Sequence, residues 1–259
     1  MMGMWRRFVI AAAAIFSLAA VEVSAQEVPA TGPAAVAPAT QPVQPAQSIA
    51  QIQKWFDNLA SSEPQVRDDA RTELLGLGKI DLDTLREVVH RSLPLAPSQS
   101  GVLHDIVVHV YLAATNDQSM PQGFLGVMLD PSDNGVQENL ELSKAGVYIF
   151  DCMPGYAGYR WLRPADVVAG IFAQGELVRL QQKEDLKNYV RNTLPGSALK
   201  LQVLRQGRMI DVTVRVDSRP PVADERFQPL RVDEWRNQRT EDAEQYWKRE
   251  FVPLLGGMT

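Results

Sequence analysis

The residues best placed to do chemistry form a short glycine-flanked loop, Gly123-Phe124-Leu125-Gly126, that runs into the apolar segment Val127 to Leu129. Glycines this close together allow backbone N–H groups to point to one side, where they can bind an anion. The apolar segment is predicted to be a strand. If that strand lies at the edge of a sheet, its free N–H and C=O groups can pair with an incoming peptide. Together these features predict a receptor for the end of a peptide chain.

Side chains that could support catalysis or metal binding are few. The three histidines, His90, His104 and His109, all fall in a segment with helical periodicity. The last two are five residues apart, which does not match the i, i+4 pair of a helical zinc site. We therefore expect surface or hydrogen-bonded core histidines and no metal site. The single cysteine, Cys152, ends the apolar run from Gly146, which predicts a buried hydrophobic side chain and not a nucleophile.

The common sequence patterns of enzymes are missing from the chain. It contains no Gly-x-Ser-x-Gly sequence, no Walker-type phosphate loop and no glycine-rich dinucleotide fingerprint. A Ser-His-Asp triad requires a further domain of barrel size, for which the segments below leave no room. We predict a protein that is not an enzyme and needs no cofactor.

Composition and charge narrow the class of partner. The chain has 259 residues, 45% of them hydrophobic and 22% charged, which is ordinary for one or two folded domains. The formal net charge is -5 and the pI is about 5.3, so no global basic field favours nucleic acid. Proteins or peptides are the expected ligands.

Residues 1–25 have the three parts of an export signal. Arg6 and Arg7 are followed by the 13-residue apolar run Phe8 to Ala20 and by the small-residue cleavage site Val23-Ser24-Ala25. A spanning helix needs about 20 apolar residues, so we predict cleavage and export to the periplasm or the medium. An uncleaved signal that anchors the chain is the alternative, and only then is the membrane a partner. With one cysteine, an exported chain must hold its cores by packing alone.

Residues 26–47 form a Pro- and Ala-rich linker with five prolines and one charge, Glu27. Such a composition cannot bury enough apolar surface to fold, which predicts a disordered, extended tether.

Residues 48–116 carry helical periodicity. An apolar stripe is formed by Ile49, Ile52, Trp55, Phe56 and Leu59. The next unit begins at Pro64, and its apolar residues Val66, Ala70 and Leu74 follow at i, i+4 and i+8. This unit resembles one hairpin of a HEAT-type repeat. Its second helix is expected over 83–91, and a last helix over 102–114. A single repeat cannot bury its own face, so a short helical bundle and a fragment of solenoid both remain open.

Residues 117–218 change to the alternation of strands and are expected to form a compact α+β domain. Strands are predicted over 126–129, 145–152, 167–172, 199–203 and 210–216, with one helix over 182–193. Arg205 to Arg208 is predicted to be the turn of a hairpin.

The extension 219–259 alternates charge and carries four aromatic residues, Trp235, Tyr246, Trp247 and Phe251. A docked amphipathic helix and a solvated tail are both compatible with this pattern.

An ordered series of motifs in residues 117–218 resembles a bacterial PDZ domain, of the type attached to trypsin-like proteases of the envelope. The motifs are Gly123-Phe124-Leu125-Gly126-Val127, Gly146-Val147-Tyr148-Ile149, Met153-Pro154-Gly155, Trp161-Leu162-Arg163-Pro164-Ala165-Asp166-Val167-Val168, and Leu194-Pro195-Gly196 before the alternating Leu201, Val203, Arg205 and Gly207. The resemblance covers about 100 residues. It implies an α+β chain with a PDZ-like small β-sandwich or barrel, flanking helices and a short N-terminal all-α, HEAT-like segment.

The resemblance implies peptide binding by strand addition, with peptide C-termini or extended segments as ligands. The N–H groups of Leu125, Gly126 and Val127 would hold the terminal carboxylate, and Val127 to Leu129 would pair with the peptide backbone. The residues that it assigns to the groove are Phe124, Leu125, Gly126, Val127, Met128, Leu129, Lys183, Leu186, Lys187 and Val190. Either lysine would suit an acidic ligand residue upstream of the terminus.

Two departures from the family pattern favour an alternative, a structural envelope-assembly protein with a degenerate groove. The segment 115–122 has no Arg or Lys before the glycine loop, so the carboxylate would rely on backbone N–H groups alone. Ala165 stands where the family has a second glycine, which predicts an altered turn. The groove could also be filled by the apolar end of the chain itself, 254–259. A regulatory part in a protease system is a further possibility.

Overall fold

The computed structural model describes residues 46–116, 120–130, 146–221 and 229–256. The expected signal at 1–25 and almost all of the expected tether at 26–47 lie outside these ranges. At the end of the tether, the Gln47 N–H donates to Asp81 Oδ1 at 2.7 Å. No helix within the described ranges is both long and apolar enough to cross a membrane.

The first folded segment is all helical. Its elements are α1 (Ile49–Asn58), α2 (Pro64–Leu74), the 3-10 turn η1 (Lys79–Asp81), α3 (Leu82–Arg91) and α4 (Pro97–Ala113). The Ser48 side chain caps α1 by accepting from the Gln51 N–H. Pro64 and Pro97 open α2 and α4, where the missing proline N–H costs nothing. The last helix therefore begins five residues before the predicted start at Val102.

These helices close around one apolar core. The predicted stripe of α1 is confirmed in part, since Ile52, Phe56 and Leu59 are buried while Ile49 and Trp55 are partly buried. The same core takes in Phe251, with Tyr246 and Trp247 packed against it, so the chain's C-terminal part covers the face that a single helical pair leaves open. The likeness to a HEAT-type repeat stays a prediction.

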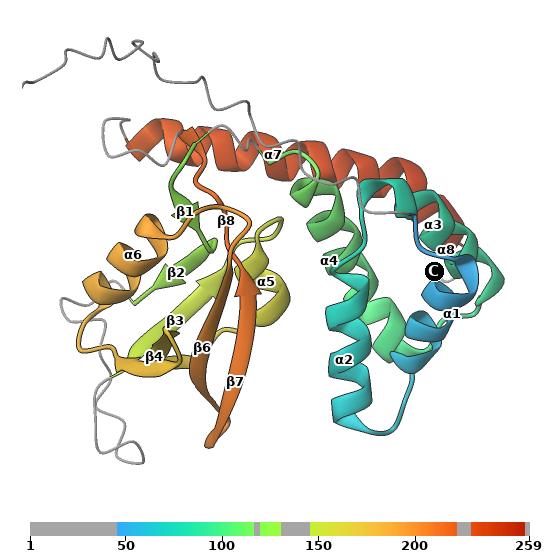
Figure 1. The fold of residues 1–259 in the computed structure, drawn as a ribbon. Coiled ribbons are helices and arrows are strands. Elements are labelled where there is room, and N and C mark those ends of the chain that lie inside the picture. The colour runs from blue at the N-terminus through green and yellow to red at the C-terminus, as the bar shows by residue number, and fades with distance from the viewer. Residues whose placement is uncertain (1–45, 117–119, 131–145, 222–228, 257–259) are drawn as a thin grey trace, which may run out of the picture. The chain divides into compact units, whose positions relative to one another are not determined.

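The C-terminal extension is helical and docked over its described residues. It forms α7 (Pro229–Glu250) and the short α8 (Val252–Leu255) (Figure 1). Phe251, between them, has no exposed surface and stacks on Trp247 at 5.4 Å between ring centroids. Tyr246 stacks on Tyr111 of α4 at 4.8 Å. Of the two alternatives left open by the sequence, the docked helix is therefore observed.

The remaining described residues form antiparallel sheets with two helices, which makes the chain α+β. The elements are β1 (Gly123–Phe124), β2 (Val127–Leu129), β3 (Val147–Cys152), α5 (Ala157–Trp161), β4 (Val167–Ala173), β5 (Glu176–Arg179), α6 (Lys183–Asn192), β6 (Ala198–Arg205), β7 (Arg208–Arg215) and β8 (Asp217–Ser218). The main sheet has the order β2-β3-β4-β6-β7, with β5 on β4, and β1 pairs with β8. The predicted hairpin turn is confirmed, since Arg205 pairs with Arg208.

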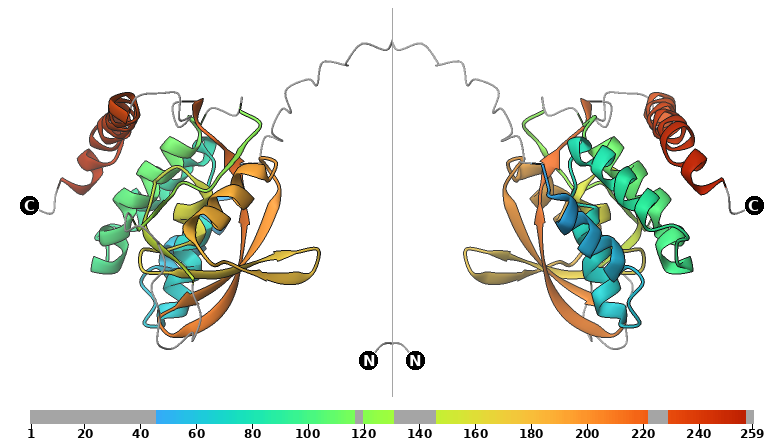
Figure 2. Two further views of the ribbon diagram at one scale, coloured as in Figure 1. Left: turned by 90° about the vertical axis from the view of Figure 1, so that its left-hand side faces the viewer. Right: turned by 90° about the vertical axis from the view of Figure 1, so that its right-hand side faces the viewer.

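The strand β5 was not predicted. It pairs with β4 and extends with it from the sheet as a two-stranded ribbon (Figure 2). Three of its four residues are exposed, so it lacks the apolar alternation by which a strand is recognised in sequence.

The core of the sheet domain is aliphatic. Fully buried side chains come from neighbouring strands: Ile149, Val168, Ile171, Leu201, Val203 and Val214. Cys152 belongs to this core and is 4% exposed. Burial, with the nearby Asp151 and Asp166 carboxylates, raises the pKa of its thiol to about 12. The prediction of a buried cysteine is confirmed, and a raised pKa disfavours the thiolate that a nucleophile needs.

The turn before β4 keeps an unusual backbone without glycine. Ala165 takes φ +72°, and its N–H donates to the Ile149 carbonyl at 2.9 Å. The next residue, Asp166, is 1% exposed and accepts from the Arg163 N–H and from two nitrogens of Arg205 at 2.9 and 2.7 Å. This ion pair, in which Asp166 is buried, holds the turn in place, and Ala165 takes the positive φ that favours glycine. That the alanine alters the turn relative to the family stays a prediction.

Candidate functional site

The strand after the glycine loop lies at the edge of the main sheet, as predicted. β2 pairs with β3 through Val127↔Cys152 and Met128↔Asp151, and no strand of the described residues pairs with its other side. The helix α6 lies beside that side (Figure 1). An edge strand faced by a helix is the geometry in which an extended peptide can be added to a sheet.

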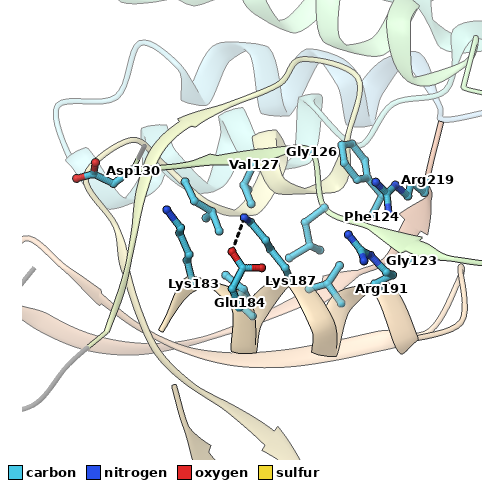
Figure 3. A pocket seen from close by; sticks show the side chains of 14 residues that line it. Gly123, Phe124, Gly126, Val127, Asp130, Lys183, Glu184, Lys187, Arg191 and Arg219 are labelled. Atoms are coloured by element: carbon cyan, nitrogen blue, oxygen red, sulfur yellow. Dashed lines mark hydrogen bonds and ion pairs between the residues drawn. The ribbon is translucent and has the colours of Figure 1, made fainter. Parts of the chain in front are cut away.

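A groove of about 460 Å³ lies between β2 and α6 (Figure 3). It is lined by Gly123, Phe124, Leu125, Gly126, Val127, Leu129, Asp130, Lys183, Glu184, Leu186, Lys187, Val190, Arg191 and Arg219. Nine of the ten residues assigned from the sequence are in this set. The exception is Met128, whose neighbours on β2 both line the groove. Because successive side chains of a strand point to opposite faces, the Met128 side chain does not reach it.

Two carbonyl groups of the glycine loop already accept hydrogen bonds from the backbone of this chain. The Leu125 carbonyl accepts from the Gly158 N–H at 2.8 Å, and the Gly126 carbonyl accepts from the Met153 N–H at 2.7 Å. Gly126 takes φ +67°, a conformation that favours glycine. No residue in the described part of the chain accepts from the N–H groups of Leu125 or Gly126. The loop thus presents backbone donors with its acceptors already used, which suits an anion.

A tyrosine held by the C-terminal helix braces the back of this loop. Tyr156 packs edge-on against Phe124 at 4.9 Å between ring centroids. Arg239 of α7 donates to the Tyr156 hydroxyl at 2.9 Å and lies over its ring, 5.4 Å from the centroid. The same guanidinium donates to the Leu112 carbonyl at 2.8 Å and to Asn116 Oδ1 at 2.7 Å. Through Arg239, α7 and the end of α4 therefore fix the position of Tyr156.

One of the three histidines, His109, takes a structural position in the core. His109 is 3% exposed, accepts from the Gly155 N–H at Nδ1 (3.0 Å) and stacks on Tyr159 at 5.1 Å. Burial, and then the nearby Arg71 and Arg160 guanidinium groups, lower the pKa of His109 to about 3, so it is neutral at pH 7. The prediction of a hydrogen-bonded core histidine is confirmed for His109. Within the described ranges, no group of three or more potential metal ligands occurs.

Positive side chains follow the groove from end to end. Lys183, Lys187 and Arg191 lie one helical turn apart on α6. Arg219 comes from the segment after β8: its N–H donates to the Gln122 carbonyl at 2.8 Å, and its guanidinium donates to Gln122 Oε1 at 3.2 Å. Arg191 and Arg219 line the groove at the glycine-loop end (Figure 3), although the segment before the loop carries no Arg or Lys. That a bound carboxylate would rely on backbone donors alone stays a prediction.

The groove also contains two carboxylates. Glu184 accepts from Lys187 Nζ at 2.8 Å, and this hydrogen bond lowers the pKa of Glu184. Asp130 lies at the far end, next to Lys183 (Figure 3). Four cationic and two anionic side chains leave the lining net positive in a chain that is net negative.

The described part of the C-terminal tail does not enter the groove. Leu254 and Leu255 of α8 pack against the helical core, and no groove-lining residue comes from α7 or α8. The last three residues, 257–259, lie outside the described ranges. Filling of the groove by Leu254 and Leu255 within one molecule is therefore not observed.

Asp217 of β8 has a carboxyl group whose pKa is raised by burial. It lies opposite Phe124 in the β1–β8 pair, and its Oδ2 accepts from the Ala157 N–H at 2.5 Å. Burial raises the pKa of Asp217 from its ordinary 3.8 to about 6, against the opposing effect of that hydrogen bond. A carboxyl group whose pKa is raised by folding stabilises the fold when it is protonated. This contribution is present below about pH 4 and is lost as the pH rises to about 6.

Asp217→Asn is expected to stabilise the protein above the pKa of the native carboxyl group. The amide is neutral at every pH and its oxygen can still accept from Ala157. The free energy of unfolding of the variant relative to the wild type should therefore rise by on the order of 2 kcal/mol between about pH 4 and pH 7. Urea denaturation across this range measures it. Asp211→Asn, which removes an exposed charge on β7, is the control; a parallel rise in that variant would contradict the assignment to Asp217.

Comparison with known proteins gives partial similarities. No protein-family model matches the chain. It is 30% identical over 118 residues to a probable periplasmic serine endoprotease, DegP-like, of Halomonas elongata, covering 45% of this chain and 24% of that protein. It is 28% identical over 100 residues to the DegP-like protein of Bartonella henselae, covering 38% and 19%. The chain thus spans about a quarter or less of the length of these curated relatives.

Among solved structures, the chain is similar to the HtrA-type protease AlgW. With the AlgW–decapeptide structure it shares 25% identity over 48% of this chain and 35% of that chain, with a TM-score of 0.32. With the AlgW–tripeptide structure it shares 27% identity over 39% and 33%, with a TM-score of 0.33.

Proposed function

We propose that this protein is a noncatalytic, exported module of a DegP-type protease system, which binds the C-terminal ends of peptides by strand addition to β2. The observation that carries the proposal is the open edge of β2, with the N–H groups of Leu125 and Gly126 at its loop end unpaired in the described part of the chain. A peptide strand would pair with β2 and place its carboxylate on those donors. The names of the curated relatives support a periplasmic location.

The lack of a catalytic role is part of the proposal. The buried, neutral His109 supports it because its Nδ1 accepts from the backbone N–H of Gly155. A general base of a serine protease must instead reach a serine hydroxyl. The module would bring peptide ends to a partner that carries out the chemistry.

Amidation of a bound peptide tests the proposal. Peptides selected from a random C-terminal library against the intact chain should lose at least about tenfold in affinity when their ends are amidated, because hydrogen bonds to a charged group contribute about 1.5–3 kcal/mol. Fluorescence anisotropy with the free-acid and amide forms of each peptide measures the difference. Equal affinity of the two forms would show that the loop does not hold a carboxylate and would overturn the proposal.

A further inference from the structure

The cationic side chains of the groove are regularly spaced. Lys183, Lys187 and Arg191 recur every four residues on α6, and all three line the groove. Since a helix rises 1.5 Å per residue, consecutive members are about 6 Å apart along the axis. Two residues of an extended peptide span about 6.8 Å. The row on α6 therefore matches every second residue of a peptide laid along β2.

The direction of the peptide follows from the position of the loop. β2 runs from Gly126 towards Asp130, and Lys183 lies at the Asp130 end while Arg191 lies at the loop end (Figure 3). A peptide whose carboxylate sits on the loop must run antiparallel to β2. Alternate side chains of such a strand point to one face, here the face of α6. The carboxylate then lies near Arg191 and Arg219, the second residue before the end lies near Lys187, and the fourth lies near Lys183.

We propose that the groove selects peptide C-termini with acidic side chains at the second and fourth positions before the last residue. The proposal rests on the proposed function, since it requires the peptide end to sit on the glycine loop. Glu184 already accepts from Lys187 at 2.8 Å, and a ligand carboxylate would share this ammonium group with it. Lys187 and Glu184 are 43% and 51% exposed, so each ligand contact is expected to change affinity by only about two- to fivefold.

A matched set of peptides tests the selectivity on the intact chain. The set consists of three labelled hexapeptides with free carboxylates that differ only at the second and fourth positions before the last residue. One peptide has Asp at both positions, one has Asn at both, and one has Lys at both. At low ionic strength the Asp peptide should bind about fivefold tighter than the Asn peptide, and the Lys peptide should be the weakest. At high ionic strength these differences should shrink, because exposed charges are screened.

Charge variants locate the effect. Lys187→Gln should reduce the preference for Asp over Asn, and Lys187→Glu should reverse the order of the Asp and Lys peptides. Lys54→Glu makes the same charge change at an exposed position of α1 and should leave the order unchanged. If the free carboxylate is required but the Asp and Asn peptides bind equally, only the acidic selectivity is overturned. If amidated peptides bind as well as free acids, the proposed function fails and this inference fails with it.

Discussion

Gly126→Ala is expected to lower the affinity for a peptide with a free carboxylate by at least about tenfold. Gly126 takes φ +67°, where an L side chain costs roughly 1–2 kcal/mol. A Cβ at this position would also overlap the Cβ and ring of Tyr156. Tyr156 cannot easily move away, because Arg239 holds its hydroxyl at 2.9 Å. The loop must therefore shift, and its N–H donors shift with it. Anisotropy titration of a selected peptide measures the loss.

Gly175→Ala is the matched control for the backbone strain. Gly175 takes φ +88° in the turn between β4 and β5, and a Cβ there would meet nothing within 4 Å. Both variants should lose about 1–2 kcal/mol of unfolding free energy from the strained φ, but only Gly126→Ala should lose peptide affinity. If both variants kept the affinity of the wild type, the role of the loop would be contradicted. If both lost affinity to the same extent, the loss would come from reduced stability and not from the loop.

The strand β2 and its loop could be predicted because their signals are local, whereas the position of the strand at a sheet edge was only implied by the resemblance to a PDZ domain. The short spacing of Gly123 and Gly126 indicates the turn, and the apolar residues that follow indicate the strand. The lysines of the groove were assigned from the resemblance to a PDZ domain, and the helix that carries them could be predicted because Leu186 and Val190 give it a clear apolar face. Arg191 was missed, although its place one turn after Lys187 on the same helix was a usable signal.

Neither the position of Arg219 at the loop nor the contact of Arg239 with Tyr156 could be predicted from local patterns. Arg219 reaches Gln122 because β8 pairs with β1, across about a hundred residues of chain. Arg239 reaches Tyr156 from a helix whose sequence was equally compatible with a solvated tail. These contacts join residues that are far apart in the sequence. They depend on which elements pack together, and local sequence patterns do not specify that packing. The four-residue strand β5 was missed for a different reason, because it is mostly exposed.

Phe251→Ala is expected to lower the free energy of unfolding by about 3–5 kcal/mol, the range for removing a fully buried phenylalanine. Phe251 has no exposed surface, stacks on Trp247 and belongs to the same core as Ile52, Phe56 and Leu74 of the N-terminal helices. The cavity left by the ring would lie where α7 and α8 meet those helices. Urea denaturation of the intact chain, followed by tryptophan fluorescence and by circular dichroism, measures the change.

Val252→Ala, at the next residue, is the control for this prediction. Val252 is 42% exposed, so its truncation should change the free energy of unfolding by no more than about 0.5 kcal/mol. If Phe251→Ala lowered the free energy of unfolding no more than Val252→Ala, the C-terminal helices would not be part of the helical core in solution.

The packing of Phe251 also affects how the hypothesis of a self-occupied groove can be tested. Deleting residues 250–259 would open the helical core, so a change in peptide binding after that deletion would not show that the tail had occupied the groove.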